Sequence, residues 1–295
     1  MRTRFLITFA ALAGQFLLAL QPARADPLPR DERERACWLQ HTRERTRVKP
    51  LEPKLVEFSN LRDGDSVRSP FRVDFAVRGM GVIPAGNADP QAGHHHLLID
   101  TPLPVNVGDA IPFNDGHRHF GKGQTGTVLD LPPGPHRLRL LFADHEHRPY
   151  FVYSPEITVN VREKRSAEPV SIEAGCAAWY QEEMSRPRPP GQRVLVANLR
   201  DGEPVTSPFS VRLAADGFGI APRGRKVAGS GHFMLEVSGG GRGQQLIDLS
   251  NGATQAQLFL APGSYTLRAR LMDESGSREL APAAQVNVLV TAQER

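Results

Sequence analysis

The chain has 295 residues with 27 glycines and 25 prolines, and aromatic residues make up only 7% of it. This length allows two domains, and the Gly and Pro content predicts many turns and little long helix. The net charge of +4 comes from acidic and basic residues interspersed along the chain. Because no basic stripe alternates with aromatic residues, the composition excludes a nucleic-acid-binding protein.

The N-terminus combines a basic start, Met-Arg-Thr-Arg, with an apolar run at 5–20 and the small-residue sequence Ala-Arg-Ala at 23–25. This order is typical of a secretory signal peptide. A membrane anchor is the alternative, but the run is short and Gly14 and Gln15 interrupt it. We therefore predict a signal peptide at 1–25, a periplasmic or secreted mature protein that begins near Asp26, and no later membrane span.

The two cysteines lie in short, charged segments with helical character. Cys37 belongs to the segment 26–54, and Cys176 belongs to the segment 163–192, which ends in a proline-rich linker. Outside the cytoplasm such a pair forms a disulfide, and we expect one here; two free thiols are the alternative.

Each cysteine segment precedes one copy of an internal repeat. Asn-Leu-Arg-Asp-Gly occurs at 60–64 and 198–202, Ser-Pro-Phe at 69–71 and 207–209, and Gly-His at 93–94 and 231–232. Matches in one order and at one offset indicate a duplicated domain.

Within each copy the apolar residues alternate with polar ones, as at Phe71, Val73, Phe75 and Val77. This period of two predicts strands, and Pro-Gly and Asp-Gly pairs separate them as turns. About seven short strands per copy predict an all-β protein of two tandem immunoglobulin-like β-sandwich domains, at 55–162 and 193–291, with a short helical segment before each.

Eight of the ten histidines fall between 94 and 147, and six of them form three His-x-His pairs. Residues two apart on a strand point the same way, so each pair presents two imidazoles together. Neutral imidazole is a ligand for copper or zinc. The candidate ligands are His94, His96, His117, His119, His145 and His147.

The second copy indicates which way these side chains point. There Phe233 occupies the position of His95, which predicts that His95 faces the core and that His94 and His96 face outward. The second copy keeps only His232, with Met234 in place of His96 and Asp248 near the place of His119. We therefore expect a site in the first copy alone, with the three pairs at one end of the sandwich.

Carboxylates often orient ligating imidazoles, and Asp100, Asp115 and Asp144 are the candidates for that role. His136 aligns with Tyr265 and is expected to cap a strand at a corner, and His41 is expected to be an isolated, exposed residue. A solvated, His-rich surface without a shared site is the alternative to a metal centre.

Several blocks of the first copy resemble a bacterial envelope family known as domain of unknown function 4399. The resemblance covers about 58–161 and rests on Ser-Pro-Phe at 69–71, Gly-Met at 79–80, Pro-Ala-Gly at 84–86, Gly-His-His-His-Leu-Leu-Ile-Asp at 93–100, His-Phe-Gly-Lys-Gly-Gln-Thr at 119–125 and Leu-Pro-Pro-Gly-Pro-His at 131–136. It implies an exported β-domain marked by histidines and supplies no activity. The second copy lacks the triple histidine and the His-Phe-Gly-Lys-Gly block.

The sequence favours an exported protein that binds copper or zinc through its first domain. A metal-free module that binds an envelope protein or a glycan is the second hypothesis. The third is a metal-dependent enzyme on the same cluster, although no nucleophile motif such as G-x-S-x-G is present and no catalytic residue can be named.

Overall fold

The computed structural model describes residues 23–49 and 54–292. The predicted signal peptide lies outside these residues except for 23–25, of which Ala23–Arg24 form β1 and pair with β20 (Ala284–Thr291). Within the described ranges, no helix is both long and apolar enough to cross a membrane.

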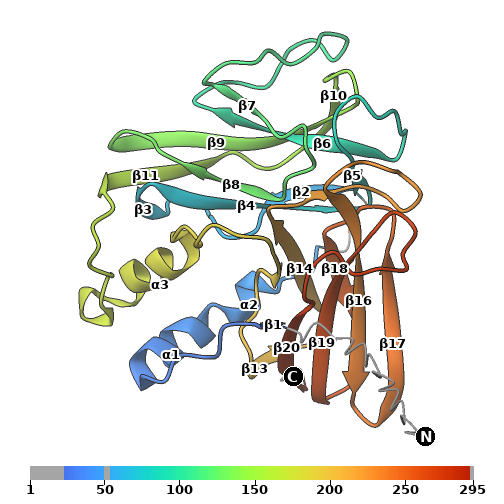
Figure 1. Cartoon of the computed structure of the whole chain (residues 1–295). Coiled ribbons are helices and arrows are strands. Elements are labelled where there is room, and N and C mark those ends of the chain that lie inside the picture. The colour runs from blue at the N-terminus through green and yellow to red at the C-terminus, as the bar shows by residue number, and fades with distance from the viewer. Residues whose placement is uncertain (1–22, 50–53, 293–295) are drawn as a thin grey trace, which may run out of the picture.

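The first copy folds into two facing sheets (Figure 1). The smaller sheet has the order β2-β4-β8, and the larger has the order β3-β11-β9-β6-β5 with β10 beside β9 and β7 beside β6. Their bounds are β2 Leu55–Phe58, β3 Ser66–Ser69, β4 Phe71–Arg78, β5 Gly81–Val82, β6 Ala92–Ile99, β7 His117–His119, β8 Gly126–Leu129, β9 Gly134–Ala143, β10 Pro149–Tyr153 and β11 Ile157–Lys164.

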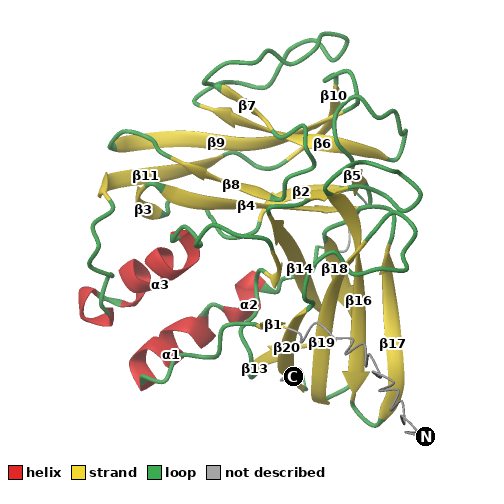
Figure 2. Cartoon of the chain, viewed as in Figure 1, coloured by secondary structure: helices red, strands yellow, loops and turns green. Residues whose placement is uncertain are grey.

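The second copy repeats this arrangement, so the chain is an all-β protein of two tandem immunoglobulin-like sandwiches, as predicted (Figure 2). Its sheets have the orders β12-β14-β18 and β1-β20-β19-β16-β15, with β13 beside β20 and β17 beside β16. Their bounds are β12 Arg193–Val196, β13 Glu203–Thr206, β14 Phe209–Asp216, β15 Gly219–Ile220, β16 Ser230–Gly239, β17 Arg242–Leu249, β18 Gln255–Leu258, β19 Gly263–Met272 and β20.

The alternating apolar residues fill the space between the sheets. Phe71, Val73, Phe75 and Val77 of β4 are all buried, as the period of two predicts. One apolar cluster extends from this core into the core of the second copy, so the two sandwiches share a continuous interior.

Three helices pack beside the sandwiches: α1 Glu32–Gln40, α2 Thr42–Arg45 and α3 Cys176–Ser185. The predicted disulfide between Cys37 and Cys176 is present and joins α1 to α3. A 3₁₀ turn, η1 Ile172–Ala174, leads into α3. Asp31 caps α1, because its side chain accepts hydrogen bonds from the backbone of Arg33 and Glu34.

Each helical segment packs on the copy that it does not directly precede. From α1, the Trp38 indole donates to Glu203 of the second copy at 2.9 Å. From α3, Glu182 accepts from Arg68 of the first copy at 2.9 Å. The helices are therefore exchanged between the copies, which sequence proximity alone does not predict.

The contact between the copies is nearly symmetric. Val77 donates its backbone N–H to the Thr254 hydroxyl at 2.9 Å, and Ala215 donates to the Thr125 hydroxyl at 3.0 Å. Because these pairs occupy equivalent positions in the repeat, the duplicated chain resembles a dimer formed within one polypeptide.

A buried ionic network crosses this contact. Arg188, from the proline-rich segment, donates two hydrogen bonds to Asp74 at 2.8 Å each and two to Asp216 at 2.8 and 3.1 Å. Burial by itself would raise the pKa of Asp74, but the charges of Arg188 and Arg72 outweigh this effect and lower it. The segment that was predicted as a linker therefore also holds the copies together.

Replacing Arg188 by Met should lower the free energy of unfolding by about 2–3 kcal/mol, because the buried Asp74 carboxylate loses its bidentate partner. Denaturant unfolding of the full chain at pH 7 measures this change. Arg193→Met is the control, since the Arg193 Nε lies 3.9 Å from Asp216 and contributes little. Equal stability of the two variants would contradict a structural role for the network.

Candidate metal site

The site begins with the alternation of side chains on β6. His95 faces the core and lies between Phe75 and Phe142, with ring centroids 5.2 and 5.0 Å away. His94 and His96 lie on the opposite face of the sheet, as predicted. They are nevertheless fully buried, which the sequence did not indicate.

The pairing of β6 with β7 adds a third imidazole. His96 pairs directly with His119 in an antiparallel register, so both side chains point to the same face. The ring centroid of His119 lies 4.9 Å from that of His94 and 5.0 Å from that of His96.

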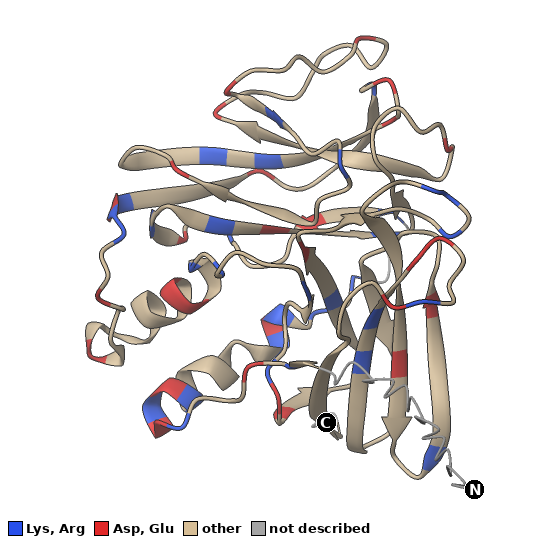
Figure 3. Cartoon of the chain, viewed as in Figure 1, with Lys and Arg blue, Asp and Glu red and all other residues tan. Residues whose placement is uncertain are grey.

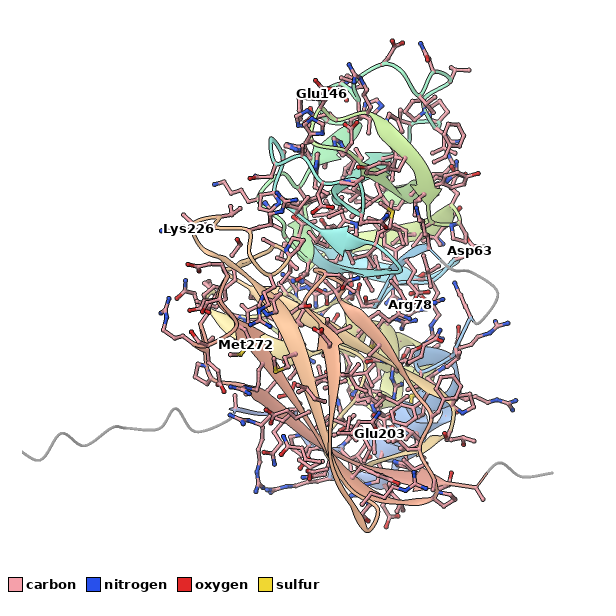
Figure 4. The ribbon with its side chains drawn as sticks, turned by 90° about the vertical axis from the view of Figure 1, so that its right-hand side faces the viewer. Asp63, Arg78, Glu146, Glu203, Lys226 and Met272 are labelled. Carbon is pink, nitrogen blue, oxygen red and sulfur yellow. A yellow bond between two sulfur atoms is a disulfide. The ribbon has the colours of Figure 1, made fainter. Side chains whose placement is uncertain are left out.

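A tight turn between β9 and β10 adds the fourth imidazole, that of His147. Asp144 shapes this turn, because its carboxylate accepts from the backbone of Glu146 at 2.9 Å and of Arg148 at 2.8 Å. His147 has the left-handed φ of 67°, which brings its ring to 5.0 Å from His94 and 4.7 Å from His119 between centroids. Figure 4 places the neighbouring Glu146 at the outer end of the first sandwich.

The four rings, His94, His96, His119 and His147, form what we name the imidazole cluster. His94, His119 and His147 each offer one nitrogen, and these three atoms lie within 4.8 Å of one another. The Nε2 atoms of His94 and His96 are 3.1 Å apart. The Nδ1 atoms of both residues and Nε2 of His119 have no hydrogen-bond partner.

The two β6 rings of the cluster are uncharged near pH 7. Burial, followed by the neighbouring imidazoles, lowers the pKa of His94 to about 3 and that of His96 to about 2. Both rings are therefore uncharged near pH 7, and an uncharged ring is the form that ligates a metal.

The loop 100–116 covers the cluster. Ile111 is buried against Leu98 and Leu141, and its N–H donates to the carbonyl of His147 at 2.9 Å. Phe113 lies 4.8 Å from His119 and 5.0 Å from His147 between centroids, and 60% of its surface is exposed. Sequence reasoning missed both residues, since the loop has no period that would mark them.

Two of the six predicted ligands lie outside the cluster. His117 donates its Nδ1 proton to the Asn114 side-chain oxygen at 2.9 Å. It pairs with Leu98, two residues further along β6 from His96. His145 is half-buried in the turn, and its carbonyl accepts from Gly86. The structure thus brings together both members of the first pair and one member of each other pair.

The predicted orienting carboxylates are also placed elsewhere. Asp100 accepts from His136 at 2.7 Å, Asp115 pairs with Arg118 at 3.3 Å, and Asp144 is committed to the turn backbone. The expectation that they orient rings of the cluster is therefore corrected: each satisfies a nearer donor.

The predictions for His136 and His41 had different outcomes. His136 donates to the carbonyl of Pro132 at 2.9 Å, as Tyr265 does to Ala261 at 3.0 Å, which confirms its predicted corner role. His41 was expected to be isolated and is not, because it stacks on Tyr180 with centroids 4.0 Å apart.

The second copy shows the same framework without the cluster. Met234 pairs with Asp248 in the register in which His96 pairs with His119. Gly276, with φ 77°, takes the turn position of His147. Each of the two donates its N–H to the backbone carbonyl of the Asp three residues earlier, at 3.0 Å. Of the four ring positions, only that of His94 keeps a histidine, His232.

Fold and site together define a tandem β-sandwich protein with a buried imidazole cluster in one sandwich. The chain belongs to the family described as domain of unknown function (DUF4399), which it matches at residues 73–162 and 211–291. No curated protein matches the chain.

The solved structures that match the chain include fibronectin-type modules. The fibronectin(III)-like modules of Clostridium thermocellum CbhA share 8% identity over 82% of this chain and 98% of that chain, with a TM-score of 0.23. A two-domain fibronectin type III segment of chicken tenascin shares 9% over 80% and 99%, with a TM-score of 0.20.

Replacing His95 by Phe, the residue of the second copy, should stabilise the protein against acid. Burial lowers the pKa of His95 to about 3. Between pH 6.5 and 3, His95 is therefore protonated in the unfolded chain and neutral in the folded chain. The free energy of unfolding of the native chain therefore falls as the pH drops through this window. Between pH 7 and pH 5, the free energy of unfolding of the variant should fall by about 2 kcal/mol less than that of the native chain. Denaturant unfolding at both pH values tests this, and parallel losses in the two proteins would contradict it.

Proposed function

We propose that this protein is exported and binds a transition metal, copper or zinc, through the imidazole cluster of its first domain. The three ligands are His94, His119 and His147, and His96 lies directly beside them. The disulfide supports a location outside the cytoplasm, where such bonds persist.

The observation that carries the proposal is the convergence of imidazole rings from three separate elements, of which His94 and His96 are buried and His119 and His147 half-buried. Buried polar atoms normally have hydrogen-bond partners, and the cluster leaves three ring nitrogens without one. Ligands of one tetrahedral zinc ion lie about 3.3 Å apart at zinc–nitrogen distances of 2.0–2.1 Å. Small ring rotations bring the three donor atoms from within 4.8 Å to that spacing.

The backbone of His147 gives independent support. A residue with a side chain costs about 1 kcal/mol or more in the left-handed region, where glycine fits freely. The second copy has Gly276 at this position, while the first copy has a histidine whose ring joins the cluster. Such strain at a converging side chain favours a functional role over an incidental one.

A second candidate function, binding of an envelope protein or a glycan, is favoured by a separate feature. A groove of about 870 Å³ lies between the domains and is lined by residues that include Lys122, Pro189 and Phe218. Lys122 and the ring of Phe218 offer a charge and an apolar face to such a partner.

His147→Gly tests the metal site without disturbing the turn, because Gly276 shows that glycine suits this backbone. Loss of one of three ligands should weaken zinc and copper binding by about 100-fold or more. Calorimetric titration of the untagged, full-length mature protein measures the affinity.

The matched controls are His145→Ala, two residues away in the same turn, and His117→Ala, two residues from His119. Both should leave affinity and a one-to-one stoichiometry unchanged. If all three variants weakened binding slightly and equally, the histidines would act as a scattered surface, and the groove would become the better guide to function.

A further inference from the structure

We propose that the imidazole cluster binds a small inorganic anion together with its metal, and that Phe113 limits the size of that anion. The inference rests on the proposed metal binding and names the ligand that completes the same site.

The charge balance of the site calls for an anion. The ligands of the cluster are imidazole nitrogens, which bring no negative charge, so a divalent cation would keep its full charge beside the buried ring of His94. Burying an uncompensated charge is costly. Among the described residues, Glu146 pairs with Arg148, Asp100 pairs with His136, and Asp144 accepts from the turn backbone through one carboxylate oxygen. An anion from solution is therefore the available counter-charge.

The geometry of the cluster leaves one coordination position of the metal open for this anion. Three protein ligands around zinc leave one position of a tetrahedron open. His96 contacts the rings of His94 and His119 but lies farther from His147, at 5.9 Å between centroids. Because its Nε2 is 3.1 Å from Nε2 of His94, its N–H can donate to an anion on the metal.

Phe113 forms the outer wall of this open coordination position. Its ring contacts the rings of His119 and His147 from the loop 100–116, and it can neither ligate nor form a strong hydrogen bond. The second copy joins the corresponding strands through the tight turn 239–242 and has no such cover. The cover therefore accompanies the cluster, and an apolar ring at this distance admits only small ligands.

The test uses the full-length protein loaded with one equivalent of Cu²⁺, whose absorption spectrum reports ligand exchange. Azide is the small anion and benzoate the bulky one. Azide should add a charge-transfer band at saturation, while benzoate should leave the native spectrum unchanged. In Phe113→Ala, the affinity for benzoate should rise by about tenfold or more, with azide affinity changed much less.

Phe259→Ala is the control, because Phe259 is 73% exposed in the second domain, far along the chain from the site. It should behave as the native protein, and retained copper stoichiometry shows that each variant is folded at the site. If azide left the absorption spectrum of the copper-loaded protein unchanged, the anion inference would be wrong and the proposed metal site would be unaffected. Failure to bind copper or zinc at all would overturn the proposed function itself. Equal benzoate binding by native protein and Phe113→Ala would overturn the role of Phe113.

Discussion

The register of β6 decides where three of the four rings of the imidazole cluster lie, those of His94, His96 and His119. His96 pairs with Leu141 on one side and with His119 on the other, so the ring of His119 is fixed on the face that His94 and His96 share. A shift by one residue would send His94 and His96 into the apolar core and His95 outward. In the observed register His95 is buried among apolar side chains, and neither of its ring nitrogens has a hydrogen-bond partner.

The duplication supplies a comparison within one molecule. Apart from β10 in the first copy and β1 in the second, the copies have the same strand order, and they exchange their helices across a nearly symmetric contact (Figure 1). Lys and Arg are interspersed with Asp and Glu over helices and strands, the mixture that the composition predicted (Figure 3). The copies differ most where the first has the cluster, the strained His147 and the covering loop. The shared fold therefore does not require these features, which favours a role in binding.

Local rules were enough for the fold and for part of the site. The period of two predicted the sandwiches, and the alignment of His95 with Phe233 predicted the faces of β6. The disulfide followed from the matched positions of Cys37 and Cys176. The choice between His145 and His147 did not follow from spacing, because a left-handed turn residue turns the ring away from the strand direction. Phe113 and the exchanged helices depend on tertiary packing, which no local period records.

If three imidazoles of the first domain hold one metal ion, the ligand shell of bound zinc will show it. X-ray absorption spectroscopy at the zinc edge, on the untagged full-length protein loaded with one equivalent of zinc, measures that shell. We expect three imidazole nitrogens at about 2.0–2.1 Å and one further light ligand. A shell made mainly of carboxylate or water oxygens, with one imidazole or none, would contradict it.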